Sequence, residues 1–204
     1  MSTAHFCDEL PLGFGWIAEH PPHLRRASHA LAEDRQVWLV DPIEIRELDE
    51  RIQALGKVVG VIQLLDRHSR DSVTLARRFG VPLYHAPTVG APGSPFHVLR
   101  AVNLPLWRES ALWWPEQKTL VVGDALGTAS YFLGPGERLA VHPLLRLFPP
   151  RCLAKVAPEN VLCGHGEGVR GEDATAALRE ALQGARRGIP RWLVGLARRR
   201  DRSA

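Results

Sequence analysis

Cysteine is scarce in this chain, and its spacing indicates neither a metal site nor a disulfide framework. Cys7, Cys152 and Cys163 are the three cysteines among 204 residues, and no two of them form a CxxC pair. An odd number at irregular spacing is not typical of a disulfide-stabilised fold or of a thiolate zinc site. The sequence therefore predicts buried free thiols.

Long apolar runs are also missing. No stretch approaches the roughly 18 consecutive apolar residues that a membrane-spanning helix requires. Residues 1–16 lack the basic segment and apolar segment of a secretory signal, which favours a cytoplasmic location. With 45% hydrophobic and 24% charged residues, the composition is typical of one globular domain with a substantial core.

Positive charge is present in excess, and it gathers at the C-terminus. The formal net charge is +4, and arginines recur through residues 186–204 around the apolar Ile189, Trp192 and Leu196. This pattern fits an amphipathic helix at a membrane surface, or a last helix docked through Trp192 and Leu196 with a solvated basic end. We favour the docked helix, and the sequence favours neither nucleic-acid nor membrane binding. We therefore predict a single domain over 1–185 and a basic C-terminal helix or tail over 186–204, with the oligomeric state open.

Strand and helix patterns alternate along the chain. Short apolar runs bounded by turn residues indicate strands, and apolar residues at helical spacing indicate the helices between them. Such alternation is typical of an α/β layered domain. The predicted strands lie at 35–42, 57–65, 81–87 and within 97–106, 110–126 and 153–169, and the predicted helices at 45–56, 72–80 and 171–188.

Polar residues gather directly after three of the predicted strands. They lie in LLDRHSRDS (64–72), LVVGDALGT (120–128) and VLCGHGEGV (161–169). Acids and a histidine from three strand ends can meet at one point, which is how metal and catalytic sites are assembled on such scaffolds. The sequence therefore predicts a functional site built from these three loops.

VWLVDP (37–42) precedes these three loops, and FGVPLYHAP (79–87) lies between the first and the second. This order of motifs resembles the metallo-β-lactamase superfamily, including its glyoxalase-type hydrolases. The resemblance covers residues 35–185, and LVVGDAL and VLCGHGEG carry most of it. It implies a four-layer αββα sandwich with a metal site at one edge of the two sheets. It also implies a hydrolase-like function.

The resemblance further implies that many of the usual metal ligands have been replaced. Members of the family hold two metal ions, usually zinc, through an HxHxDH loop, a histidine in a PGH-like segment, the aspartate of GD and the histidine of GH, and a metal-bound water is their nucleophile. When the HxHxDH loop is laid on DRHSRDS with its aspartate at Asp71, its histidines fall on Arg67, Ser69 and Ser72. The PGH histidine falls on Trp107.

Two of the family's ligands are retained, Asp124 of GD and His165 of GH. Together with Asp71 they would hold at most one divalent ion, zinc, manganese or iron, with a coordination position open for water. Asp71 or Asp124 would be the base that orients or deprotonates that water. His68 would reach this site only in a different register of the loop.

Arg67 has two candidate roles in this interpretation. It would compensate for the missing cation by pairing with Asp71 or Asp124, or it would bind an anionic group of a small-molecule ligand. Two functions therefore stay open: a single-metal hydrolase of unknown substrate, and a metal-free module that binds a ligand or partner in the same cleft. Conventional di-zinc β-lactamase activity is not expected, because the ligands it needs are missing.

Overall fold

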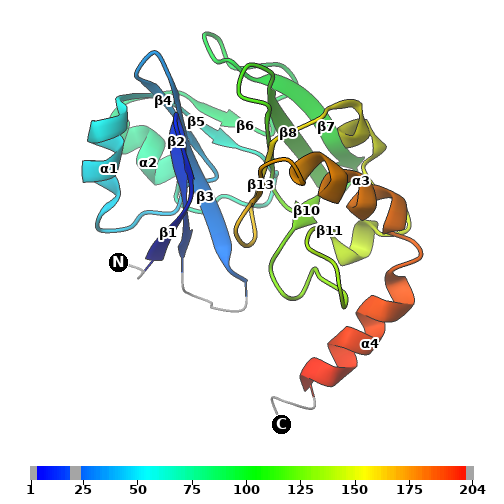
Figure 1. Cartoon of the computed structure of the whole chain (residues 1–204). Coiled ribbons are helices and arrows are strands. Elements are labelled where there is room, and N and C mark those ends of the chain that lie inside the picture. Colours follow the sequence, from blue (N-terminus) through cyan, green and yellow to red (C-terminus); the bar gives the residue numbers. More distant parts are fainter. Residues whose placement is uncertain (1–3, 19–23, 201–204) are drawn as a thin grey trace.

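Two β-sheets packed face to face form the centre of the protein, and helices cover their outer faces (Figure 1). This computed structural model describes residues 4–18 and 24–200, with side chains up to residue 196. Within that part of the chain, the first sheet has the strand order β1-β2-β3-β4-β5-β6 and the second the order β13-β12-β9-β8-β7. Strands β10 and β11 form a small ladder of their own.

The bounds of the elements follow the chain from the first sheet into the second. The first sheet contains β1 (Ala4–Leu10), β2 (Gly13–Ala18), β3 (Arg26–Glu33), β4 (Gln36–Val40), β5 (Lys57–Gln63) and β6 (Leu83–His85), with α1 (Leu48–Leu55) and α2 (Ser72–Phe79) between its last strands. The later elements are β7 (His97–Leu104), β8 (Trp107–Trp114), β9 (Thr119–Val122), β10 (Leu126–Gly127), β11 (Ala140–Val141), β12 (Asn160–Cys163), β13 (Val169–Arg170), α3 (Ala174–Gly184) and α4 (Ile189–Arg200), with 3₁₀ turns at Pro143–Leu145 and Arg151–Lys155.

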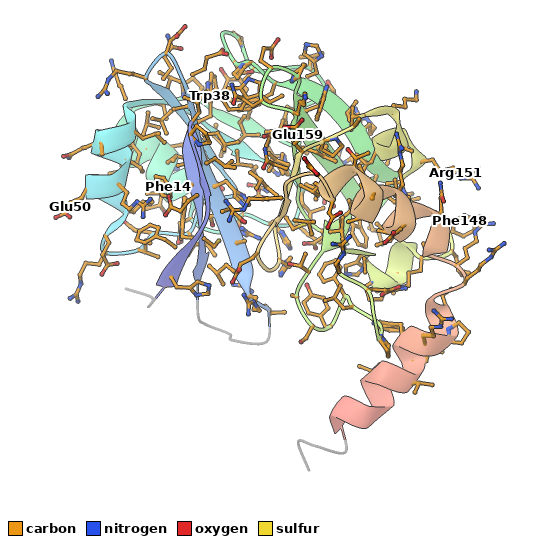
Figure 2. The ribbon with its side chains drawn as sticks, viewed as in Figure 1. Phe14, Trp38, Glu50, Phe148, Arg151 and Glu159 are labelled. Atoms are coloured by element: carbon orange, nitrogen blue, oxygen red, sulfur yellow. The ribbon has the colours of Figure 1, made fainter. Side chains whose placement is uncertain are left out.

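Alternation along the strands divides the core into three layers. In β4, Val37 packs with Phe14 in the layer beneath α1 and α2, whereas Trp38 lies in the layer between the sheets (Figure 2). In β12, Val161 belongs to the layer beneath α3 and Leu162 to the central layer. Because successive side chains of a strand point to opposite faces, both sheets are covered on both sides. The predicted αββα sandwich is confirmed.

The N-terminal strands β1, β2 and β3 were not predicted, although they make up half of the first sheet. Strand β2 is buried at every position, so it shows no alternation of polar and apolar residues. The predicted strands and helices after residue 35 are present, with ends that differ by a few residues. Helix α2 ends before Gly80, whose left-handed φ of 65° closes the helix.

The two sheets are joined along one edge. Arg26 at the start of β3 forms a β-bridge with His165, which follows β12, and Leu65, which follows β5, forms one with Glu109 of β8. Backbone hydrogen bonds between neighbouring residues extend each bridge. Strands β4, β5 and β6 run parallel, as do β9 and β12. The loops that follow these strands therefore meet at one edge, where ligands bind in many α/β folds.

Helix α4 extends away from the two-sheet body (Figure 1). Its Trp192 docks it to the rest of the protein, because Nε1 donates a hydrogen bond to the carbonyl oxygen of Tyr131 at 2.8 Å. Leu193 and Val194 are about half exposed. Arg202, which the sequence placed in the same basic segment, lies outside the described residues. In the part of the chain that the structure describes, no helix has both the length and the apolar character needed to cross a membrane.

Candidate metal centre

Three side chains converge where the sheets are joined. His68 comes from the loop after β5, Asp124 follows β9 and His165 follows β12. Nε2 of His165 lies 3.0 Å from Oδ1 of Asp124, and Nε2 of His68 lies 3.2 Å from Oδ2 of the same carboxylate. One potential ligand atom from each residue lies within 4.8 Å of the other two. We call these three residues the His-Asp-His cluster.

The backbone around His165 determines which nitrogen faces the cluster. Nδ1 lies 2.6 Å from the carbonyl oxygen of Leu24, and because a carbonyl can only accept, Nδ1 carries a proton. Nε2 therefore faces Asp124: with a proton it donates to the carboxylate, and without one it would offer its lone pair to a metal ion. The glycine after this histidine is required: Gly166 has a φ of 89°, and a Cβ on it would lie 2.2 Å from Oγ1 of Thr128.

Asp124 is ionised but incompletely satisfied. Burial alone would raise the pKa of its carboxyl, but the contacts with His165 and His68 lower that pKa well below the usual range. Oδ1 is buried and has no hydrogen bond of acceptable geometry within the described ranges, even though Nε2 of His165 is close enough for an ion pair. Nδ1 of His68 is also buried without a partner among the described residues. A carboxylate facing two imidazole nitrogens in this way suits a bound cation.

A buried acid holds the loop that carries Asp124. Glu109 on β8 is 1% exposed. Its Oε1 accepts the backbone N–H groups of Gly123 and Ala125 at 3.1 and 2.9 Å, and its Oε2 accepts Nε1–H of Trp107 at 3.0 Å. Burial, and then the charge of Asp124, raises the pKa of Glu109 to about 8. Because its two backbone donors flank Asp124, Glu109 is a positioning residue for the cluster.

His142 and Tyr131 border the cluster and were not singled out by the sequence. Burial lowers the pKa of His142 to about 4, so its ring is neutral at neutral pH. Its Nδ1 accepts the backbone N–H of Leu144, which leaves Nε2–H as a donor. Burial and the charge of Asp124 raise the pKa of Tyr131, so its phenol stays protonated, and its ring meets His165 edge-on. Both residues come from the segment after β10, where no spacing pattern marks them.

Arg70 supplies a fixed positive charge beside the cluster. Its guanidinium donates to the backbone carbonyls of Ala27, Asp41 and Gly164, the last two at 2.8 and 2.9 Å. Burial lowers the pKa of Arg70, and the charges of Asp41 and Asp124 oppose that effect. Burial also raises the pKa of Asp41. The guanidinium thus links both sheets and partly neutralises the acids behind the cluster.

Asp71, a predicted ligand, and Arg67, a predicted cleft residue, do not join the His-Asp-His cluster. Oδ2 of Asp71 accepts the backbone N–H of Glu44 at 2.8 Å, and in the described part of the chain the position expected for Asp71, beside Asp124 and His165, is taken by His68. Arg67 was expected to pair with Asp71 or Asp124. It instead lies 3.6 Å from Asp66 and stacks over the ring of Trp107 at 5.1 Å.

The remaining predicted cleft residues surround the cluster without joining it. Ser69 is exposed, and the buried Oγ of Ser72 has no hydrogen-bond partner within the described ranges. Trp107 is buried, and its ring packs edge-to-face against His142 at 4.8 Å. None of the three belongs to the His-Asp-His cluster.

The backbone of Arg70 explains the difference in loop register. Its φ of 40° lies in the left-handed region, so the chain changes direction just before α2 begins at Ser72. His68 and Arg70 therefore turn inward, whereas Arg67 and Ser69 are exposed. An alignment of the loop anchored on Asp71 does not place His68 beside Asp124, and no residue-type signal in the loop reveals this turn.

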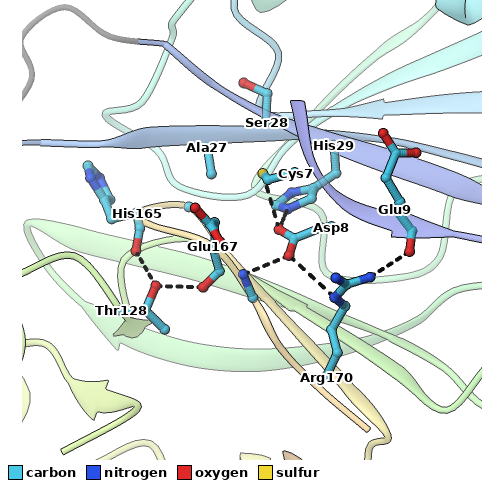
Figure 3. A network of polar contacts seen from close by, with 12 residues as sticks. Cys7, Asp8, Glu9, Ala27, Ser28, His29, Thr128, His165, Glu167 and Arg170 are labelled. Carbon is cyan, nitrogen blue, oxygen red and sulfur yellow. Dashed lines mark hydrogen bonds and ion pairs between the residues drawn. The ribbon is translucent and has the colours of Figure 1, made fainter. Parts of the chain in front are cut away.

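A second buried network lies beside the strand that follows His165 (Figure 3). Oδ1 of Asp8 accepts the backbone N–H of Gly168 at 2.8 Å and lies 3.9 Å from Nε of Arg170. Nε2 of His29 is 3.4 Å from Oδ2 of Asp8, and Sγ of Cys7 donates to the same oxygen at 3.5 Å. We call these five residues the Asp8 network. It ties β1 and β3 to the loop after β12 and so holds the segment that carries the histidine of the cluster.

Comparison with known proteins identifies the fold. No protein-family model matches the chain, and no curated protein matches it by sequence. Among solved structures, a metallo-β-lactamase from Pontibacter korlensis is 12% identical with a TM-score of 0.60, covering 89% of this chain and 99% of its own. The metallo-β-lactamase DIM-1 is 12% identical with a TM-score of 0.62 (90% and 95%), and FIM-1 from Pseudomonas aeruginosa, in a mono-zinc form, is 11% identical with a TM-score of 0.59 (90% and 96%). The chain therefore has the metallo-β-lactamase fold.

Proposed function

We propose that the chain is a hydrolase-like protein whose His-Asp-His cluster holds a single divalent metal ion. His68, Asp124 and His165 are the three ligands in this proposal. The observation that carries it is the convergence of two imidazole nitrogens on one buried carboxylate, with Nδ1 of His165 already bound to a backbone carbonyl. Two imidazoles and a carboxylate suit zinc, and they also suit iron(II) or manganese.

A second ion is not part of the proposal, because the surrounding side chains are not metal ligands. Arg70 already places a positive charge beside Asp124, and a second cation there would be repelled. Ser69 and Trp107 stand where the resemblance would put further histidines. The metallo-β-lactamase FIM-1 has been described in a mono-zinc form, so a single ion is compatible with this architecture.

The chemistry divides between the ion and the chain. A bound divalent ion supplies a water of lowered pKa as a nucleophile. Tyr131 and His142 each keep a proton at the border of the cluster, where they can donate a hydrogen bond to a substrate oxygen that gains charge. Glu109 holds the Asp124 loop in place. This arrangement supports hydrolysis of an ester-like bond, with the substrate still to be identified.

Zinc titration of chelator-treated protein by calorimetry tests the proposal. Wild type should bind about one equivalent, whereas Asp124→Asn and His68→Ala should lose binding, because each removes one of three ligands. Asp71→Asn is the matched control: it removes the carboxylate that the sequence would choose, and it should bind zinc like wild type. Zinc should also raise the thermal stability of the binding variants alone.

The opposite results are equally informative. Retention of zinc by His68→Ala together with its loss in Asp71→Asn would contradict the ligand set. Absence of zinc, iron and manganese binding in correctly folded wild type would contradict the metal proposal, and it would favour the metal-free binding module that the sequence left open.

A further inference from the structure

Beside the His-Asp-His cluster lies a cavity of about 410 Å³, large enough for a small ligand. The lining side chains that bear on its chemistry are Arg26, Arg67, His68, Ser69, Arg70 and Asp71. We call this cavity the arginine pocket. Among its lining residues that the structure describes, three are arginines and one is an acid. These charges give the pocket a positive field, and such a field concentrates anions.

Arg26 is a cation without a counter-charge in the part of the chain that the structure describes. No ion pair or side-chain hydrogen bond engages its guanidinium there. Its charge lowers the pKa of the neighbouring Arg70, although burial is the larger cause. Two like charges lining one cavity raise each other's energy. An anion bound between them would relieve that repulsion.

Arg67 is held with part of its guanidinium free. Its Cζ lies 5.1 Å from the centroid of the Trp107 ring, and its Nε lies 3.6 Å from Oδ1 of Asp66. Asp66 has a second partner, because its Oδ2 accepts hydrogen bonds from Nε–H and from the backbone N–H of Arg108, at 3.3 and 3.2 Å. The side chain of Arg67 is 49% exposed. The contact with Trp107 holds the guanidinium at the pocket, and among the described residues its terminal N–H groups are left for an oxygen-rich ligand.

The one acid of the pocket is occupied elsewhere, and one histidine connects the pocket to the cluster. Asp71 accepts a backbone hydrogen bond from Glu44, so its charge is partly satisfied. The terminal nitrogens of Arg70 donate hydrogen bonds to backbone carbonyls. Arg70 therefore contributes positive charge to the pocket but few free hydrogen-bond donors. His68 lines the pocket and also contacts Asp124. A ligand seated in the pocket therefore lies next to the proposed metal centre.

We propose that the arginine pocket binds the anionic group, a phosphate or a carboxylate, of a small-molecule substrate whose hydrolysable bond reaches the His-Asp-His cluster. Arg26 and Arg67 contact the anion and Ser69 borders it. The hydrolytic role rests on the proposed function, whereas binding of an anion by the pocket does not require the metal. Guanidinium groups suit both anions, because each offers paired oxygens to a planar fork of donors.

The test is calorimetric titration of chelator-treated protein with inorganic phosphate and, separately, with succinate. Wild type should bind at least one of them, and added salt should weaken the binding. Arg26→Gln should weaken it about tenfold, and Arg67→Gln by a smaller factor, because charge-assisted hydrogen bonds are lost. Arg77→Gln is the matched control, since Arg77 is an exposed arginine of α2 outside the pocket. Circular dichroism checks that each variant is folded.

The outcomes separate the two proposals. Equal affinity in wild type and Arg26→Gln, or no binding of either anion, overturns the pocket assignment. Phosphate binding that requires zinc and is unchanged in Arg26→Gln also overturns the pocket assignment. That result does not contradict the proposed metal centre. Binding of the anion by a protein that takes up no metal supports the anion site and removes its hydrolytic role. Preference for phosphate over succinate, or the reverse, identifies the anion.

Discussion

The Asp8 network and the His-Asp-His cluster each bury a carboxylate against histidine, but they satisfy it in different ways. Oδ1 of Asp8 receives the backbone N–H of Gly168, and the charge of Arg170 lies 3.9 Å away. Oδ1 of Asp124 receives no hydrogen bond of acceptable geometry from the part of the chain that the structure describes. Buried carboxylates in folded proteins are normally satisfied. Donors of the protein satisfy the Asp8 carboxylate, although Nε2 of His29 has no hydrogen bond among the described residues, whereas Oδ1 of Asp124 is left open for a cation.

The difference follows from which elements surround each acid. Asp8 lies on β1 facing the loop after β12, so backbone donors of one sheet reach a side chain of the other (Figure 3). Asp124 lies at the end of β9, where the nearby backbone N–H groups of Gly123 and Ala125 are taken by Glu109. Glu109 thus removes the donors that would otherwise satisfy Asp124. A structural carboxylate beside it keeps the cluster's carboxylate available.

The largest expected effect comes from removing each carboxylate in turn from metal-free protein. Asp8→Ala should lower the free energy of unfolding by about 3–5 kcal/mol, because it leaves the backbone N–H of Gly168 without its acceptor and the buried His29 without its ion-pair partner. Asp124→Asn should lower it by less, about 1–3 kcal/mol, because it keeps the side-chain volume but removes a charge that the contacts with His165 and His68 stabilise. Urea denaturation measures both.

The two variants should show the opposite order of effect on zinc binding. Folded Asp8→Ala should still bind zinc, and Asp124→Asn should not. If Asp124→Asn is the more destabilised variant without metal, the cluster is a structural ion pair like the Asp8 network, and the distinction between the two regions fails.

Much of the fold could be predicted from the sequence, because its strands and helices carry their own periodicity. Strand β4 and helix α1 have clear patterns, and the order of motifs indicated the sandwich. Asp124 and His165 could be predicted as neighbours because each follows a buried strand, and parallel strands end at the same edge. Strand β2 could not, because burial on both faces erases the alternation that marks a strand.

The rest of the site depends on backbone geometry that residue types do not encode. His68 rather than Asp71 lies beside Asp124, in a loop whose Arg70 has a left-handed φ. His142 is brought to the site by packing against Trp107, from a segment with no regular pattern. Such positions need the tertiary fold before they can be assigned.

An effect of intermediate size is expected in the pH dependence of the free energy of unfolding. It should distinguish Glu109, beside the His-Asp-His cluster, from Asp8. The folded-state pKa of Glu109, about 8, lies above the ordinary value of 4.5. Its contribution to stability is therefore fully present below the ordinary pKa and is lost as the pH rises through about 8. The pKa of Asp8 is lowered instead: burial alone would raise it, but His29 and the backbone of Gly168 outweigh burial. Its contribution is lost only as the pH falls into the acid range.

Glu109→Gln tests this separation. We expect a loss of about 1–3 kcal/mol at mildly acidic pH, because the amide nitrogen would face N–H donors that the carboxyl accepts. The fall in the free energy of unfolding from about pH 5 to about pH 8 should be shallower than in wild type. Denaturation at several pH values, without metal, measures both. A slope equal to that of wild type would place the titration in another group.

The smallest expected effect concerns the thiol of the Asp8 network. Burial, and then the charge of Asp8, raises the pKa of Cys7, so its sulfur is a neutral thiol that donates one long hydrogen bond at 3.5 Å. Cys7→Ala should therefore lower the free energy of unfolding by about 1 kcal/mol, mostly through lost packing. Zinc stoichiometry should not change, and Cys152→Ala serves as a cysteine control outside both regions.

The Cys7→Ala variant shows which hydrogen-bond donors satisfy the Asp8 carboxylate. If Cys7→Ala costs far less than Asp8→Ala, the carboxylate is stabilised mainly by the donors of the second sheet, Gly168 and Arg170. These donors have no counterpart at Asp124, so the two buried acids differ in their donors and not merely in their neighbouring histidines. A loss as large as that of Asp8→Ala would instead make the thiol the essential donor. Asp8 would then depend on a single weak donor. The two carboxylates would differ less in how completely hydrogen bonds satisfy them.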